Sequence, residues 1–231
     1  MGLFRRAWAQ LSHMSKDLII LVLGIYLALW MENTVQDWEE LDKQQDYLSR
    51  LAEDISVDQQ HIKSVVTFLE KKIDRVSSGI SFLQNSKLDP LEPETQSKAL
   101  ELGSVVNNYY FFTPQDFTYL SMRESGDFKL IRSNTLKSKL IRLYGRYKLV
   151  DTLQKNYLQG LDDEFIPFWM RNVDMLSQEL SNPDIVTEPL FRNMIAFAGN
   201  DTQTRLSVLN KLTLEVNELA NELKRYQEES L

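Results

Sequence analysis

The sequence predicts an all-α protein. We expect one N-terminal transmembrane helix that continues into a long coiled-coil-like helix, packed in an extramembrane helical bundle. Three observations predict this class. Residues 18–31 form an uninterrupted apolar run. Apolar residues recur at spacings of three and four along most of the remaining chain. The 231 residues include only 8 Gly and 6 Pro, which leaves few of the tight turns that a sheet requires.

Composition excludes several classes of function. The formal net charge is −7, which argues against a general nucleic-acid-binding protein, so no nucleic acid is expected among its partners. The chain contains no Cys, which excludes disulfides, thiolate nucleophiles and cysteine-ligated metal sites. The absence of Cys is compatible with an oxidising compartment but does not identify one.

The first segment, residues 1–16, is basic. Arg5, Arg6 and Lys16 are its charged side chains. We interpret them as residues that set orientation and face the lipid, in a short interfacial helix on an anionic leaflet. A frayed terminus is the alternative. The apolar residues that would share one face of this helix are Leu3, Phe4, Trp8 and Leu11.

The apolar run predicts a transmembrane helix over residues 17–35. The run from Leu18 to Met31 has fourteen residues, whereas a span needs roughly 20, so the flanking residues must supply the rest. Two alternatives remain open. A cleaved signal peptide would have small residues after the run, where Trp30 and Glu32 stand instead. A buried core helix of a soluble protein would also be apolar.

Charge predicts the orientation of the anchor. Basic residues precede it, and after it the first Lys is Lys43. Five acids come before that Lys: Glu32, Asp37, Glu39, Glu40 and Asp42. The expected location is therefore the bacterial inner membrane, with a cytoplasmic N-terminus and a periplasmic C-terminal domain. Asp17 and Glu32 lie at the expected membrane edges, where carboxylates usually face water but can also mark an ion path.

Gly24 and Ala28 are a pair of small residues four positions apart in the apolar run. Small residues let two helices approach closely in lipid, so this pair predicts transmembrane helix packing. The expected partners are the lipid bilayer and either further copies of the chain or a membrane-complex subunit.

Residues 36–86 predict a long stalk or coiled-coil helix. No Pro or Gly occurs between Met31 and Ser78, and the helix is expected to reach about Asn85. Its narrow apolar stripe has Gln44 and Asp58 at two seam positions. The other members of the stripe are Leu41, Leu48, Leu51, Ile55, Ile62, Val65, Leu69, Ile73, Val76, Ile80 and Leu83.

Residues 87–231 are expected to form the helical bundle domain. Pro90 and Pro93 mark a loop, and a helix is predicted over 94–108. Thr113 is the predicted N-cap of the next helix, with Pro114 at its first position.

Gly126 is expected to end that third helix, and Ser133 to cap the following one. Pro167 should kink or end this fourth helix. A short helix is predicted to end at 199–201, before a last helix with a heptad stripe. The heptad stripes could pair within one chain or between chains.

Two stretches carry a family resemblance. One is the opening Asp17-Leu-Ile-Ile-Leu-Val-Leu-Gly-Ile-Tyr-Leu-Ala-Leu-Trp, with Trp38-Glu39-Glu40 after it. The other is the pattern of residues 110–150 around Phe117, Ser125-Gly126 and Ser133-Asn134. They resemble a bacterial family of uncharacterised single-pass membrane proteins. Trp30 and Asn33-Thr34 depart from its usual Gln and Asn pair. The resemblance implies an N-terminal anchor and a helical periplasmic domain, and it implies no activity.

No motif for catalysis or for a cofactor occurs, so no enzyme and no cofactor are expected. His13 and His61 are far apart, and Asp162-Asp163-Glu164 reads as a solvated helix face above apolar residues. The sequence therefore predicts a membrane-tethered helical interaction protein: a scaffold, a sensor or an accessory subunit. The alternative is a homo-oligomeric channel or transport component, and an unfamiliar enzyme site near Asp163 and Trp169 ranks last.

Overall fold

The computed structural model describes residues 2–85 and 88–229, and the side chains of residues 21–84 and 88–228. The chain divides into two compact units, Met1–Ser49 and Arg50–Leu231. The predicted all-α class is confirmed, apart from a two-stranded hairpin. The elements are α1 (Gly2–Asn85), α2 (Pro93–Asn107), α3 (Phe117–Glu124), η1 (Asp127–Leu130), α4 (Asn134–Gly160), η2 (Leu161–Phe165), α5 (Ile166–Asn172), β1 (Val173–Asp174), β2 (Glu179–Leu180), η3 (Pro183–Thr187) and α6 (Pro189–Glu229).

The first unit consists of helix α1 up to Ser49. Every residue from Leu21 to Asn33 is exposed in it. Among the residues whose placement is described, no helix has both the length and the apolar character that a membrane span requires.

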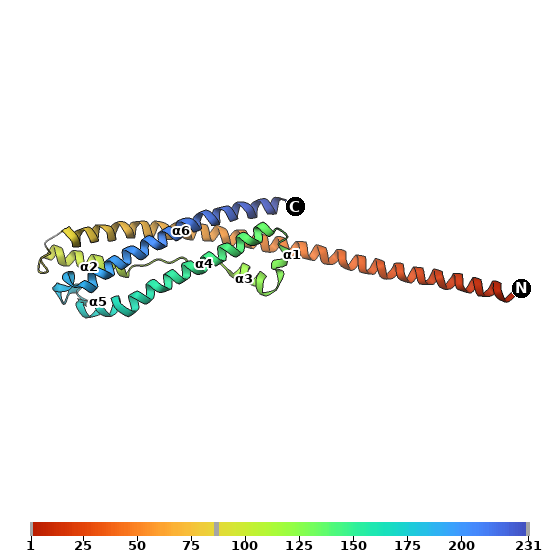
Figure 1. The fold of residues 1–231 in the computed structure, drawn as a ribbon, viewed down its shortest axis with the longest axis horizontal. Helices are drawn as coiled ribbons and strands as arrows, with labels where there is room; N and C mark the ends of the chain where they lie inside the picture. Colours follow the sequence, from red (N-terminus) through yellow and green to blue (C-terminus); the bar gives the residue numbers. More distant parts are fainter. Residues whose placement is uncertain (1, 86–87, 230–231) are drawn as a thin grey trace. The chain divides into compact units, whose positions relative to one another are not determined.

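The second unit is a bundle in which α6 runs antiparallel to the 50–85 part of α1 (Figure 1). The Gln59 side-chain amide donates to the Asn217 side-chain oxygen over 2.7 Å, and Gly199 lies against Val76. Earlier residues of α1 therefore lie beside later residues of α6, as expected of antiparallel helices. These two apolar stripes are buried against each other within one chain, which was one of the two pairings left open by the sequence.

Helix α4 also runs antiparallel to α6. Arg146 Nη2 lies 2.7 Å from Glu215 Oε1, and Lys139 Nζ lies 3.0 Å from Glu222 Oε2. From Lys139 to Arg146 the position on α4 advances by seven residues, and the partner on α6 moves back by seven, from Glu222 to Glu215. The antiparallel register therefore holds over two turns. Both are partly exposed and add little to stability by themselves, but they fix which helix faces meet.

Helix α6 corrects one sequence expectation. A break was predicted at 199–201, but the helix is continuous from Pro189 to Glu229. A Cβ on Gly199 would lie 3.0 Å from Val76 Cγ1, so this glycine permits close packing of α6 on α1. The sequence alone does not distinguish a glycine that ends a helix from one that permits two helices to pack closely.

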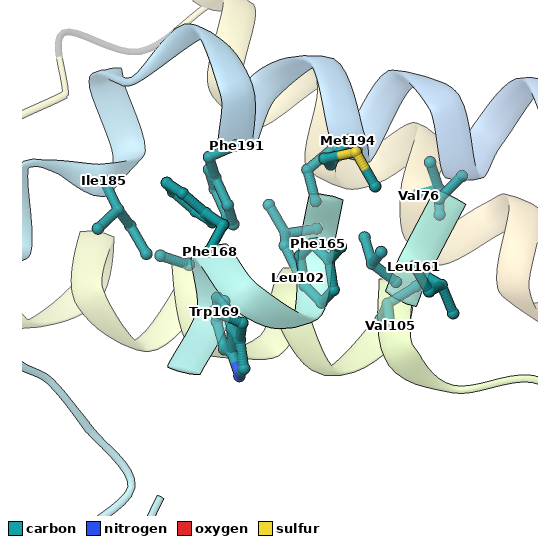
Figure 2. Packing of buried hydrophobic residues seen from close by; sticks show 14 of the residues in the cluster. Val76, Leu102, Val105, Leu161, Phe165, Phe168, Trp169, Ile185, Phe191 and Met194 are labelled. Carbon is teal, nitrogen blue, oxygen red and sulfur yellow. The ribbon is translucent and has the colours of Figure 1, made fainter. Parts of the chain in front are cut away.

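An apolar core lies where the end of α1, α2, α5, η3 and the start of α6 meet (Figure 2). Phe165, Phe168 and Trp169 enter it from one side, and Phe191 and Met194 from the facing helix. The Trp169 ring lies against Gly103, where a Cβ would be only 2.0 Å from the ring, so α2 can approach α5 only without a side chain at 103.

The helical stretch around Pro167 is divided into three elements, and none of them ends at Pro167. Helix α4 ends at Gly160 and is followed by the π turn η2, in which the Ile166 amide bonds to the Leu161 carbonyl five residues back. Pro167 then lies in the first turn of α5, where a missing N–H costs nothing. The chain continues into the β1–β2 hairpin, with Val173 opposite Leu180, which the sequence analysis did not anticipate.

The predicted caps have different outcomes. Ser133 is the N-cap of α4, and its hydroxyl accepts from the Leu136 amide over 3.2 Å. Gly126 takes a left-handed φ of 79° directly after the C-cap Ser125 of α3. The prediction for Thr113 and Pro114 is wrong, because α3 begins only at Phe117 with Asp116 as its N-cap. Thr113 and Pro114 belong to an extended segment that distant side chains hold in place.

Candidate functional site: a cleft under an extended strap

An extended segment, residues 108–116, joins α2 to α3 and is called the strap below. Its aromatic residues alternate between two faces, as they do along a strand. Tyr109 stacks on Phe111, with ring centroids 4.9 Å apart. On the other face, Tyr110 and Phe112 both contact the His61 ring, at 5.5 and 5.4 Å. The aromatic run is therefore divided, with Phe112 buried and Tyr109 and Tyr110 exposed.

Side chains from α1 and α4 satisfy the backbone of the strap. Gln154 accepts from the Phe112 amide (2.8 Å) and donates to the Phe112 carbonyl (2.9 Å). Asp58 accepts from the Gln115 amide (2.9 Å), and the Tyr144 hydroxyl donates to the Gln115 carbonyl (3.3 Å). Buried backbone groups need partners, and here these helices supply them in place of a neighbouring strand.

Asp58 is the buried acid beneath the strap. Besides the Gln115 amide, its carboxylate accepts from the Tyr147 hydroxyl over 2.7 Å. Burial raises the pKa of Asp58 to about 6, although both hydrogen bonds act in the opposite direction, and nearby Asp54 raises it further. Burial, with the charge of Asp58, also raises the pKa of the Tyr147 hydroxyl, which therefore stays a donor. This seam position was visible in the sequence, but its partners were not.

Lys72 anchors the other end of the strap. Its ammonium donates to the Asn108 carbonyl (2.6 Å), to the Val106 carbonyl (3.3 Å) and to the Tyr157 hydroxyl (2.9 Å). Burial, and then the charge of Arg205, lowers the pKa of Lys72 to about 7. The Arg205 guanidinium is itself buried between the rings of Phe111 and Tyr157, at 5.3 and 4.9 Å.

Asp201 is the acid that compensates this buried charge. Its carboxylate lies 2.6 Å from Arg205 Nε, while the two terminal nitrogens of Arg205 have no hydrogen-bond partner among the described residues. Burial raises the pKa of Asp201 despite the pairing. The aromatic faces of Phe111 and Tyr157 therefore provide much of the environment of this guanidinium.

A cleft of about 780 Å³ lies between the strap, α3 and α4. Stacked rings form part of its wall: Tyr119 lies on Tyr144 with centroids 3.9 Å apart and planes 2° from parallel. Its lining is mostly apolar, which is typical of a small-molecule site. The lining residues are Phe111, Phe112, Thr113, Pro114, Asp116, Tyr119, Leu120, Arg123, Ile141, Tyr144, Gly145, Tyr147, Lys148, Asp151, Gln154, Lys155 and Leu158.

Gly145 lies in this lining, in the interior of α4. A glycine there costs about 1 kcal/mol of stability relative to alanine. Other helical glycines of the second unit have a packing reason, since a Cβ on Gly79 or Gly103 would strike a neighbouring side chain. A Cβ on Gly145 would meet nothing within 4 Å, so the chain's own packing gives no reason for this glycine.

A second cavity, of about 450 Å³, lies beside Gly103 and Trp169 and opens near the β1–β2 hairpin. Of the residues considered as an enzyme site, Trp169 lines this cavity and Asp163 does not. Asp162, Asp163 and Glu164 are exposed in the π turn, while Phe165 beside them is buried. Within residues 21–84 and 88–228, no cluster of three or more His, Asp or Glu is arranged to hold a metal ion.

The other predicted site residues lie on α1. Gly24, Ala28 and Glu32 are exposed, and a Cβ on Gly24 would meet nothing within 4 Å. Four more, Arg5, Arg6, Lys16 and Asp17, lie outside the part of the chain whose side chains are described.

Sequence reasoning missed the cleft because its parts come from three separate segments. Gly145 was the one local signal, as a glycine in the middle of an otherwise clear helical stripe. Gln154 and Lys72 looked like ordinary surface residues of a helix. Comparison with family models, with curated proteins and with solved structures gave no match for this chain.

Proposed function

We propose that this chain is a membrane-tethered helical interaction protein of the bacterial inner membrane, with residues 50–231 as its folded, periplasmic working domain. One observation carries the proposal. Nine large apolar side chains between Leu21 and Met31 are exposed, each to between 53% and 69%. Their contact with water costs on the order of 10 kcal/mol in total, so an apolar environment outside the chain is required.

The distribution of this apolar surface favours a bilayer over a single partner. Eleven consecutive residues cover three turns of helix, so apolar side chains point in every direction around the axis. A helix that docks in one groove needs only one apolar stripe, whereas a helix surrounded by lipid needs apolar residues all round. Leu18, Ile19 and Ile20 extend the run towards the length of a span.

The flanking charges support the proposed orientation. Arg5, Arg6 and Lys16 precede the run, and Glu32 and Asp37 follow it. Retention of basic residues in the cytoplasm would leave the second unit on the other side. The interaction role rests on the cleft of that unit and on the absence of a catalytic motif in the sequence.

Alkaline carbonate extraction of membranes tests the tether. We expect the full-length chain to stay in the membrane pellet. Replacing Leu23 and Leu27 by Arg should release it, because each charge costs about 2.5–3.5 kcal/mol at the centre of a span. Val57→Arg is the matched control, since Val57 is 45% exposed on the same helix but outside the apolar run.

Release of the unaltered chain by carbonate would refute the tether, as would equal retention of the double Arg variant. Self-association of the extracted chain that is lost in Gly24→Leu would instead favour a role for the Gly24 and Ala28 face. An ion flux from that oligomer would support the channel alternative.

A further inference from the structure

We propose that the cleft between the strap, α3 and α4 binds a single-chain amphiphile with an anionic headgroup, such as a long-chain carboxylate. The site lies entirely within residues 50–231. The proposal therefore does not depend on how the first unit meets a membrane, and either proposal can fail without the other.

The interior of the cleft favours an apolar ligand body, because three of its polar side chains already have partners. The Tyr147 hydroxyl donates to Asp58, and the Tyr144 hydroxyl donates to the Gln115 carbonyl. Both polar atoms of the Gln154 amide bond to Phe112. What remains for a ligand is mostly ring faces and aliphatic surface, so a polar ligand body would lose hydrogen bonds to water there.

The charged groups around the cleft select an anionic headgroup. Lys155 is neutralised by Asp151, with the two charged atoms 2.7 Å apart. Arg123 lies over the Tyr119 ring, 5.6 Å from its centroid, and within the described part of the chain neither Arg123 nor Lys148 forms an ion pair. Besides the Lys155–Asp151 pair, the cleft is lined by one carboxylate, Asp116, so two unpaired cations face one anion before a ligand binds. A carboxylate headgroup restores the balance and accepts charge-assisted hydrogen bonds from both cations.

Gly145 is an exposed position in the lining, where the chain leaves room for an occupant. Its missing side chain leaves open space in the wall of the cleft, and no neighbouring atom of the chain uses that space. A larger residue at 145 would fit the fold but narrow the cleft. An occupant of the cleft explains why a helix-interior position keeps a residue that weakens the helix.

The volume of the cleft limits the occupant to a ligand with one acyl chain. About 780 Å³ lies in the range of sites for single small molecules. A lipid with two acyl chains would leave much of its apolar surface outside the cleft. The cleft is therefore matched to a single chain whose headgroup stays at the rim, beside Arg123 and Lys148.

Photocrosslinking in lipid discs tests the proposal on the full-length protein. The probe is a sixteen-carbon carboxylate with a diazirine in its chain, and its uncharged methyl ester is the comparison. Mass spectrometry of the digested protein locates the crosslinks. We expect saturable labelling of the lining segments, 111–123 and 141–158, with the carboxylate favoured about tenfold over the ester.

Two sets of variants decide the outcome. Gly145→Trp should reduce cleft labelling about tenfold, whereas Thr152→Trp, on an exposed position of the same helix outside the lining, should not. Replacing both Arg123 and Lys148 by Gln should abolish the preference for the carboxylate. Replacing the exposed Lys63 and Lys211 by Gln is the matched control for charge.

Circular dichroism establishes that each variant retains its helices. Undiminished cleft labelling in a folded Gly145→Trp protein would overturn the proposal, as would equal labelling by the carboxylate and the ester. A crosslinked two-chain phospholipid in the cleft would overturn the assignment to a single-chain ligand. If Gly145→Trp unfolds, the Arg123 and Lys148 double variant still decides the outcome.

Discussion

Gln154 forms two hydrogen bonds to one residue, accepting from the Phe112 amide at 2.8 Å and donating to the Phe112 carbonyl at 2.9 Å. A side-chain amide thus pairs with the backbone as a neighbouring strand would. The two residues are 42 positions apart, so this pair fixes the strap to α4 and sets one wall of the cleft.

Replacing Gln154 by Leu should lower the free energy of unfolding by about 2–4 kcal/mol, because two buried backbone groups lose their partners. Gln159→Leu, on an exposed position of the same helix, should change it by less than about 0.5 kcal/mol. Urea denaturation followed by circular dichroism measures both. Equal stabilities of the two variants would show that the strap does not depend on this pair.

Asp58 should make the protein less stable as pH rises from about 4 to 6. The pKa of Asp58 is about 6 in the folded state and 3.8 ordinarily, so within this window the folded protein binds the extra proton. Stability from this group is present below pH 4 and is lost as pH rises through 6. Asp58→Asn should remove up to about 3 kcal/mol of this pH dependence, while exposed Asp162→Asn should leave it intact. An unchanged pH profile in Asp58→Asn would contradict the assignment.

Lys72 should have the opposite effect at higher pH. The pKa of Lys72 is about 7 in the folded state and 10.5 ordinarily, so between these values the unfolded chain binds more protons. The contribution of Lys72 to the unfolding free energy therefore increases from pH 7 to 10. Lys72→Met should flatten this increase, and the neighbouring exposed Lys71→Met should not. Denaturation midpoints at pH 7, 8, 9 and 10 distinguish the two variants.

Two glycines should respond oppositely to the same substitution. Gly145→Ala should raise the free energy of unfolding by about 0.5–1 kcal/mol, because alanine favours the helix and its Cβ meets nothing. Gly103→Ala should lower it by about 1–3 kcal/mol, because its Cβ would lie 2.0 Å from the Trp169 ring. Thermal unfolding measures both, and a destabilised Gly145→Ala would mean that the space at 145 is filled.

Periodic stripes made most helices predictable, because burial against one neighbour leaves a repeat of three and four in the sequence. Ser133 was predictable for a similar local reason, since a cap bonds within its own turn. Thr113 was misread because Asp58 and Gln154, far away in the chain, hold its segment extended. Gly199 was misread because its reason is Val76 on another helix. The cleft was unpredictable on the same ground, as its walls come together only through tertiary contacts.

The bond between Gln59 and Asn217 joins positions 158 residues apart, which bears on how the protein is made. The 50–85 stretch leaves the ribosome before its partner α6 exists. At ~5–20 residues per second, synthesis of the 158 residues between these positions takes about 8 to 30 seconds, during which α6 does not cover the stripe. During that time α6 of a second copy offers the same complementary surface to this stretch. Exchange of α6 between two chains is therefore the characteristic misassembly expected of this fold.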